Sequence, residues 1–293
     1  MKFGWMKGTL LLAGMMLVVL MKPVAATETL DPFSIPATAT HKITSEQLQR
    51  SYDIYVKTPV GYDDKANAGK VYPVIYLNDG PYTFQVASGV THLPMGRSHK
   101  FDRAILVGIS YAQGENGMAS RVRDLTPVED KRWRKYQTGG GEAYLRFLEE
   151  EVIPLVESTY RVDPAKRTLV GHSLGGSFGA WVLLKRPELF ANYILTSPSL
   201  WFKDKFIFDL ERETAAKRRD LKAKVYFAIG SRETKADSSN YPMVSQLKDF
   251  AAILESRDLP GLELKTEIIP DALHETTFPL AFTRASQWIF GRK

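Results

Sequence analysis

A serine between two glycines is the feature of this sequence that most constrains its fold. The run Thr168-Leu-Val is followed by Gly-His-Ser173-Leu-Gly, a G-x-S-x-G pattern. In this pattern a strand turns sharply into a helix, and the turn lifts the serine hydroxyl clear of the sheet. The helix that follows directs free N–H groups toward Ser173 and can stabilise an oxyanion there. A glycine-rich turn without chemistry can share the pattern, so the neighbouring elements must decide between the two.

Strands and helices alternate along the chain. Short apolar, β-branched and aromatic runs indicate strands at 52–56, at an edge of the sheet, and at 71–77, 104–109, 167–170, 193–196, 225–229 and 262–269. Helical spacing of apolar residues indicates helices at 142–160, 174–185, 205–222, 243–257 and 277–290, with a kink or break at Pro154. This alternation predicts an α/β domain with a mostly parallel sheet and helices on both faces. Residues 113–141 show neither pattern and are expected to form a binding loop or lid.

The N-terminal residues have the pattern of a signal peptide. Lys2 and Lys7 precede an apolar run at 9–21, and small residues follow at 24–26. We therefore expect cleavage after Ala26 and a periplasmic location. The apolar run is short for a membrane span, so an uncleaved anchor facing the periplasm is the alternative.

The expected division of the chain is a signal peptide at 1–26, an irregular leader at 27–40 and one α/β domain at 41–293. Removal of the signal peptide takes away three lysines and no acidic residue, which lowers the net charge from +6 to +3. A net charge this small does not indicate a nucleic-acid partner, which would require a strong basic stripe with aromatic platforms.

Composition and motif content exclude several other kinds of site. The sequence has no cysteine, which excludes disulfides, a thiol nucleophile and a lipoprotein anchor. It has no H-E-x-x-H metal motif, and no Gly-Lys-Ser/Thr follows the glycines of the serine motif. No metal or cofactor is therefore expected, and the sequence carries no indication of the oligomeric state.

A serine nucleophile needs a base within hydrogen-bond reach and usually an acid that orients the base. Among the five histidines, His274 follows the last predicted strand, where the base lies in the order serine, acid, histidine. Glu233 follows the preceding strand and is the expected acid, with Asp237 as the alternative; Glu233 can instead pair with a cation on an exposed loop. His172 lies beside Ser173 and is expected to point elsewhere.

The oxyanion of an ester intermediate needs two N–H donors. The N–H of Leu174, directly after the serine, is the first expected donor. The second should come from the loop at 78–82, but Pro81 in that loop has no N–H. Tyr82 is therefore the expected second donor, with Gly80 as the alternative.

Six segments spread over the chain form a set that is more specific than the serine motif alone. They are Tyr76-Leu-Asn-Asp79-Gly80, Arg121-Val-Arg-Asp124-Leu-Thr-Pro127, Gly171-His-Ser-Leu-Gly-Gly176, Ser197-Pro-Ser-Leu-Trp201, Gly230-Ser-Arg-Glu233 and His274. The set resembles the esterase D family of α/β hydrolases, in its branch of exported and siderophore esterases. The resemblance implies an α/β-hydrolase fold, Ser173 as nucleophile, His274 as base and Glu233 at the acid position. Some siderophore esterases of this group are described as working with a serine–histidine dyad, which leaves the role of the acid open. Pro81 departs from the family's commoner residue after Asp-Gly.

The resemblance also implies a class of substrate, a carboxylic ester hydrolysed through an acyl-enzyme. The favoured substrate is a ferric catecholate siderophore of the trilactone type. Such a substrate is anionic and aromatic, which makes Arg121 and Trp201 candidates for binding it, although Arg121 can instead pair with Asp124 and Trp201 can belong to the core. Further basic and aromatic side chains near the expected mouth are Arg132, Trp133 and Arg134.

Other functions remain compatible with the same residues. A general carboxylesterase for acetyl, feruloyl or short acyl esters would use the same acyl-enzyme, and so would an acyltransferase. A non-catalytic binding protein with a hydrolase fold is the alternative from another class.

Overall fold

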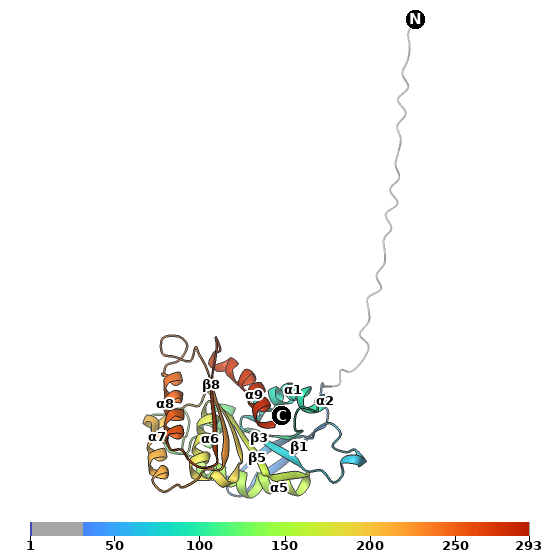
Figure 1. The fold of residues 1–293 in the computed structure, drawn as a ribbon, viewed down its shortest axis with the longest axis horizontal. Coiled ribbons are helices and arrows are strands. Elements are labelled where there is room, and N and C mark those ends of the chain that lie inside the picture. The colour runs from blue at the N-terminus through green and yellow to red at the C-terminus, as the bar shows by residue number, and fades with distance from the viewer. Residues whose placement is uncertain (2–31, 293) are drawn as a thin grey trace. The chain divides into compact units, whose positions relative to one another are not determined.

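An eight-stranded sheet is the centre of the fold (Figure 1). The computed structural model describes Met1 and residues 32–292, of which residues 35–292 belong to one compact unit. The strands are β1 (Thr38–Ser45), β2 (Arg50–Lys57), β3 (Tyr72–Leu77), β4 (Ile105–Ile109), β5 (Val162–His172), β6 (Asn192–Thr196), β7 (Ala223–Gly230) and β8 (Leu262–Ile269). Their order is β1-β2-β4-β3-β5-β6-β7-β8. β2 pairs antiparallel with β1 and β4, and all other neighbours are parallel, which confirms a mostly parallel sheet.

Helices cover both faces of this sheet (Figure 1). They are α1 (Gly80–Val90), α2 (Pro94–Arg97), α3 (Gly117–Asp124), α4 (Gly141–Phe147), α5 (Ile153–Thr159), α6 (Leu174–Lys185), α7 (Phe202–Ala215), α8 (Met243–Ser256) and α9 (His274–Phe290), with single turns at Lys65–Asn67 and Pro187–Leu189. α1 and α9 pack on one face through side chains such as Phe84 and Phe278. α4 to α8 pack on the other through residues such as Phe178 and Phe250. Each such buried side chain contributes about 1.5–3 kcal/mol to folding.

The parallel strands bring the predicted catalytic residues to one edge of the sheet. Ser173 follows β5, Glu233 lies just beyond β7, and His274 lies shortly after β8, where it begins α9. Because the carboxyl ends of parallel strands meet at the same edge, these three residues converge although they are far apart in sequence.

The N-terminal boundary differs from the expected one. Part of the expected leader at 27–40 belongs to β1, which pairs with β2 along its whole length, from Thr38 opposite Lys57 to Ser45 opposite Arg50. The strand expected at an edge is therefore internal, because β1 lies outside it. The expected signal peptide lies outside the described residues, apart from Met1.

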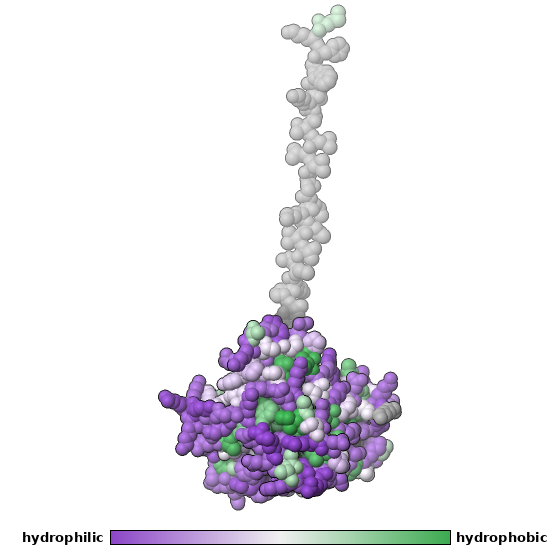
Figure 2. Space-filling model, turned by 60° about the vertical axis from the view of Figure 1, so that its left-hand side comes forward, coloured by the Kyte–Doolittle hydropathy of each residue, from purple (hydrophilic) through white to green (hydrophobic). Residues whose placement is uncertain are grey.

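Among the described residues, no helix is both long enough and apolar enough to span a membrane. The face of the molecule in Figure 2 is mainly hydrophilic, with only small groups of hydrophobic residues.

Two helical segments show why local sequence patterns succeed or fail. Residues 113–141 were expected to lack helix, but they contain α3, whose start is capped by Asn116: its Oδ1 accepts hydrogen bonds from the N–H groups of Met118 at 3.0 Å and Ala119 at 3.3 Å. The helix expected to kink or break at Pro154 does not end there. It changes to a π-helical turn at Leu148–Val152, directly before α5, and Pro154 is the second residue of α5. Proline cannot donate a backbone hydrogen bond, and a π-helical turn is a usual way to accommodate such an irregularity.

Candidate active site

Ser173 lies in a strained turn between β5 and α6. Its φ of 58° and ψ of −118° belong to a region that L-residues rarely adopt. The turn is tight enough to require glycine, because a Cβ at Gly171 would overlap the carbonyl oxygen of Gly175. A Cβ at Gly176 would lie only 2.9 Å from the carbonyl oxygen of Thr196. The predicted strand, turn and helix are therefore all present, and the strain is localised at the serine.

Glu233 and His274 form a hydrogen-bonded pair. Glu233 is fully buried, and its Oε2 lies 2.7 Å from Nδ1 of His274. Its Oε1 accepts hydrogen bonds from Ser197 Oγ at 2.6 Å and the Gly230 N–H at 2.8 Å. Burial alone would raise the pKa of Glu233, but the hydrogen bonds from His274, Ser197 and Gly230 outweigh it and hold the pKa below its ordinary value. A carboxylate on Nδ1–H leaves Nε2 of His274 as the free acceptor, the tautomer that a general base requires.

The alternative acid, Asp237, lies elsewhere. Both of its oxygens bind the guanidinium of Arg232 at 2.8 Å. This ion pair is partly exposed, and Asp237 makes no hydrogen bond to His274. The geometry therefore favours Glu233 over Asp237.

The hydroxyl of Ser173 is held by a second serine. Its Oγ lies 3.3 Å from Ser199 Oγ, and within the described part of the chain it makes no hydrogen bond to His274. Catalytic hydrogen bonds are often long or unformed without substrate and tighten when it binds. In this resting arrangement, therefore, Ser199 and not the base holds the hydroxyl of Ser173.

His172 was expected to point away from the site, but the structure places its ring beside that of His274. Its ring lies 4.6 Å from the ring of His274, between centroids, at 40°. Its Nδ1 lies 2.9 Å from Thr196 Oγ1. Burial, and then the proximity of His274, lowers the pKa of His172 to about 3. His172 is therefore a neutral ring packed beside the candidate base.

Of the expected oxyanion donors, Leu174 fits the structure and Tyr82 does not. Leu174 is the first residue of α6, and its N–H has no acceptor among the described residues, as is usual at a helix start. The N–H of Tyr82 instead donates to the carbonyl of Asp79 at 3.0 Å and closes the first turn of α1. Among the described residues, the N–H of Gly80 has no backbone hydrogen-bond acceptor. Gly80, the alternative, therefore replaces Tyr82 as the candidate second donor.

Arg121 is part of a buried ion pair. Its Nε and Nη2 contact the two carboxylate oxygens of Asp79 at 2.8 and 3.1 Å, and its side chain is only 15% exposed. A Cβ at Gly175 would lie 3.4 Å from Asp79 Oδ2, so this pair abuts the start of α6. The expected alternative pairing with Asp124 is wrong, because Asp124 binds Arg123 instead. Because Arg121 is paired with Asp79, it is not the free cation that was expected to bind an anionic substrate.

Trp201 lies among other aromatic rings. Tyr241 stacks on it at 3.9 Å between centroids with an angle of 2°, and Trp133 lies nearly parallel to it at 6.3 Å. Tyr241 therefore covers one face of the Trp201 ring. Arg132 is also engaged, because it binds Asp130 at 2.6 Å and Asp204 at 2.8 Å.

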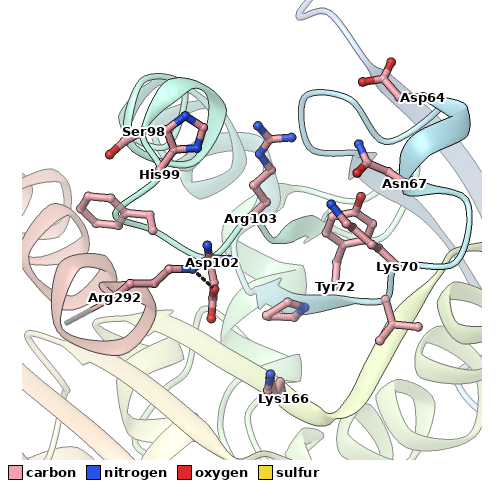
Figure 3. A pocket seen from close by; sticks show the side chains of 13 residues that line it. Asp64, Asn67, Lys70, Tyr72, Ser98, His99, Asp102, Arg103, Lys166 and Arg292 are labelled. Carbon is pink, nitrogen blue, oxygen red and sulfur yellow. Dashed lines mark hydrogen bonds and ion pairs between the residues drawn. The ribbon is translucent and has the colours of Figure 1, made fainter.

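A separate pocket lies near the amino ends of β3 and β4, whereas the predicted catalytic residues follow the carboxyl ends of their strands (Figure 3). Its volume is about 620 Å³, and its lining includes Lys70, Tyr72, Arg103 and Lys166. Arg292, also in the lining, already pairs with Asp102 at 2.7 Å. The pocket contains none of the predicted catalytic residues. Among the described residues, no group of three or more His, Cys, Asp or Glu side chains could hold a metal ion.

Several polar residues of the site were not assigned a role from the sequence. Thr196, Ser197 and Ser199 lie where β6 ends, and Thr277 Oγ1 in α9 lies 2.9 Å from Glu233 Oε1. Ser197 and Ser199 were part of a matching segment, but only its tryptophan was considered functional. Their position in the sequence could have identified them, because they are polar residues at the end of the strand that follows the serine motif.

Known proteins match this chain over most of its length. A model of the family described as "Putative esterase" matches residues 45–260. The ferri-bacillibactin esterase BesA of Bacillus subtilis is 29% identical over 245 residues, which cover 79% of this chain and 83% of BesA. The crystal structure of the BES protein from Bacillus cereus is similar with a TM-score of 0.78 at 27% identity, covering 90% and 98% of the two chains. That of an IroE-like serine hydrolase from Shewanella oneidensis has a TM-score of 0.75 at 25% identity, covering 86% and 80%. The chain therefore belongs to the "Putative esterase" family and is an ester-hydrolysing enzyme with the α/β-hydrolase fold.

Proposed function

We propose that this enzyme hydrolyses the ester bonds of siderophores with Ser173, His274 and Glu233 as its catalytic triad. The observation that carries the proposal is the hydrogen bond between Glu233 and His274 Nδ1 beside a serine in a strained turn. The name of the relative BesA supports a siderophore as the substrate class. Within that class, the family resemblance favours a catecholate siderophore of the trilactone type.

In the first half of the reaction, His274 Nε2 accepts the proton of Ser173 as its Oγ attacks the ester carbonyl. Glu233 stabilises the imidazolium that forms and holds the ring in the tautomer with Nδ1–H. The N–H groups of Leu174 and Gly80 are the proposed donors to the oxyanion. The tetrahedral intermediate then collapses, the C–O bond of the ester breaks, and His274 returns the proton to the departing alcohol.

In the second half, water replaces the alcohol. His274 takes a proton from the water, whose oxygen attacks the acyl-enzyme carbonyl. The bond between the acyl group and Ser173 Oγ breaks, the carboxylic acid leaves, and Ser173 regains its proton. A trilactone would be opened at one ester bond per cycle.

We also propose that residues 1–26 direct export and are removed, so that the enzyme acts in the periplasm. The charged start, the apolar run and the small residues at 24–26 support this. N-terminal sequencing of the protein from the periplasmic fraction should begin at Thr27. A chain that retains residue 1 and stays with the membrane would support the anchor instead.

Turnover of a panel of esters tests the substrate class. The wild-type enzyme should open a trilactone siderophore, with or without iron, at a higher kcat/KM than simple acetyl and feruloyl esters. The Ser173→Ala variant, measured with the same panel, gives the background rate. Equal or faster turnover of the simple esters would support a general carboxylesterase and contradict the siderophore proposal.

A further inference from the structure

The segment Thr196–Ser199, where β6 ends, contacts both the proposed nucleophile and the proposed acid. The carbonyl of Thr196 accepts the N–H of Ser173 at 3.0 Å, and its side chain binds His172. Ser197 Oγ binds Glu233 at 2.6 Å, and Ser199 Oγ lies 3.3 Å from Ser173 Oγ. One short stretch of backbone thus connects the nucleophile and the acid.

Ser197 is held in a conformation that aims its hydroxyl at the acid. Its φ of 43° lies in the left-handed region, and the residue is fully buried. Its N–H donates to the carbonyl of Ala228 at 2.7 Å, which fixes the backbone against β7. A strained and buried non-glycine residue persists only when its surroundings over-determine it, and such residues gather at functional sites.

The contacts to Glu233 divide between its two oxygens. Oε1 has three partners, Ser197 Oγ, the Gly230 N–H and Thr277 Oγ1, while Oε2 faces His274 Nδ1. The partners of Oε1 restrict rotation of the carboxylate about its last torsion angle, and the bond from Ser197, at 2.6 Å, is the shortest of them. Removal of the Ser197 hydroxyl would therefore loosen the orientation of His274 without touching His274 itself.

Ser199 acts on the nucleophile in a comparable way. The residue is 2% exposed, and its N–H donates to the carbonyl of Ser173 at 3.1 Å. Among the described residues, its hydroxyl makes one hydrogen bond, the one to Ser173 Oγ. This contact selects one direction for the Ser173 hydroxyl while the base is not yet bonded to it.

We propose that Ser197 and Ser199 are positioning residues for the esterase reaction, Ser197 through Glu233 and His274, and Ser199 through Ser173. The proposal rests on the catalytic assignment above, but not on the siderophore as substrate. It predicts that loss of either hydroxyl lowers the rate of the chemical step and leaves substrate affinity nearly unchanged. A geometric error of about 1 Å at a reacting group can cost about 100-fold in rate.

The test compares Ser197→Gly and Ser199→Ala with Ser286→Ala in the full-length enzyme. Glycine adopts a φ of 43° without strain, so Ser197→Gly removes the hydroxyl while keeping the backbone geometry. Ser286 is a buried serine of α9 whose hydroxyl has no hydrogen-bond partner among the described residues, and it controls for the loss of any buried hydroxyl. The readouts are the rate of labelling by a fluorophosphonate, kcat and KM for a simple aryl ester, and the thermal midpoint.

We expect both site variants to label and turn over about 10- to 100-fold more slowly with KM within about twofold of wild type, while Ser286→Ala matches wild type. The downfield proton NMR signal of the His274–Glu233 hydrogen bond should shift in Ser197→Gly and stay in place in Ser199→Ala. Wild-type labelling and turnover in both site variants would overturn the proposal. A loss of rate that matches a loss of folded protein would also overturn it. Because the probe and the ester are not siderophores, a failure of the siderophore proposal would leave these results unchanged.

Discussion

The proposed catalytic centre and the ion pair of Arg132 with Asp204 hold their charged groups in opposite ways. The carboxylate of Glu233 is fully buried and is surrounded by hydrogen-bond partners from Ser197, Gly230, His274 and Thr277. The ion pair of Arg132 and Asp204 joins side chains that are 60% and 76% exposed. A buried carboxylate with several hydrogen-bond partners keeps one orientation, as a catalytic group must. An exposed ion pair is weak and can rearrange. We therefore expect substitutions in the proposed catalytic centre to change the chemical step, and substitutions in the exposed pair to change activity and stability little.

The largest effect is expected for His274→Ala. Removal of the base should lower kcat by about 10⁶-fold, because a serine hydroxyl is a poor nucleophile without one. Turnover of a simple aryl ester by the purified variant measures this. His172→Phe is the matched control, because it keeps a ring beside His274, and a comparable loss in that variant would question which histidine is the base.

The next largest effect is expected for Glu233→Gln. An amide cannot stabilise the imidazolium and favours the wrong tautomer, so kcat should fall by about 10⁴-fold. Asp237→Asn, in the alternative acid, should retain wild-type kcat. Full activity of Glu233→Gln would instead show that a serine–histidine dyad is sufficient.

The pH dependence separates the two members of the pair. The pKa of Glu233 lies below its ordinary value of 4.5, so the carboxylate stays charged throughout the neutral and mildly acidic range. A loss of rate in acid should therefore come from the base, because a protonated imidazole cannot accept the proton of Ser173. A kcat that does not fall as the pH is lowered would contradict His274 as base. The contribution of Glu233 to stability should persist above pH 4.5 and disappear only as pH falls through its lowered pKa.

Arg121→Ala should reduce stability more than it affects recognition of an anionic substrate. It would leave Asp79, whose side chain is 6% exposed, without its cation. Breaking a buried ion pair on one side typically costs about 3–5 kcal/mol in unfolding free energy. Urea unfolding measures the loss, and an unchanged midpoint together with a raised KM for an anionic ester would instead place Arg121 in the substrate site.

Asp204→Asn should have the smallest effect. The ion pair that it removes joins Arg132 and Asp204, whose side chains are 60% and 76% exposed, so solvent screens the interaction. Thermal unfolding should not distinguish the variant from wild type. A clear loss of stability would mean that this exposed pair is as fixed as the buried carboxylate of Glu233.

The same contrast explains how much the sequence could predict. The serine turn, the strand order along the chain and the late histidine follow from local patterns, and the structure places Ser173, Glu233 and His274 at one edge as expected. The irregularity before Pro154, a π-helical turn in place of a break, is equally local, because proline removes a helix hydrogen bond. These features depend on backbone constraints that a few residues encode.

The errors concern side chains whose partners are distant in sequence. The pairing of Arg121 with Asp79 spans 42 residues, and nothing near Arg121 distinguished Asp79 from Asp124. The stack of Tyr241 on Trp201 and the contact of Ser199 with Ser173 likewise require the tertiary fold. Tyr82 was misjudged because no helix was predicted at 80–90, and the start of α1 decides which N–H is free.

Covalent labelling of Ser173 tests the central claim most directly. The wild-type enzyme is treated with diisopropyl fluorophosphate and digested, and the modified peptide is identified by mass spectrometry. The account predicts a single adduct on Ser173, formed faster at pH 8 than at pH 5, and no adduct in Ser173→Ala. An unlabelled enzyme, or an adduct on another residue that persists in Ser173→Ala, would contradict it.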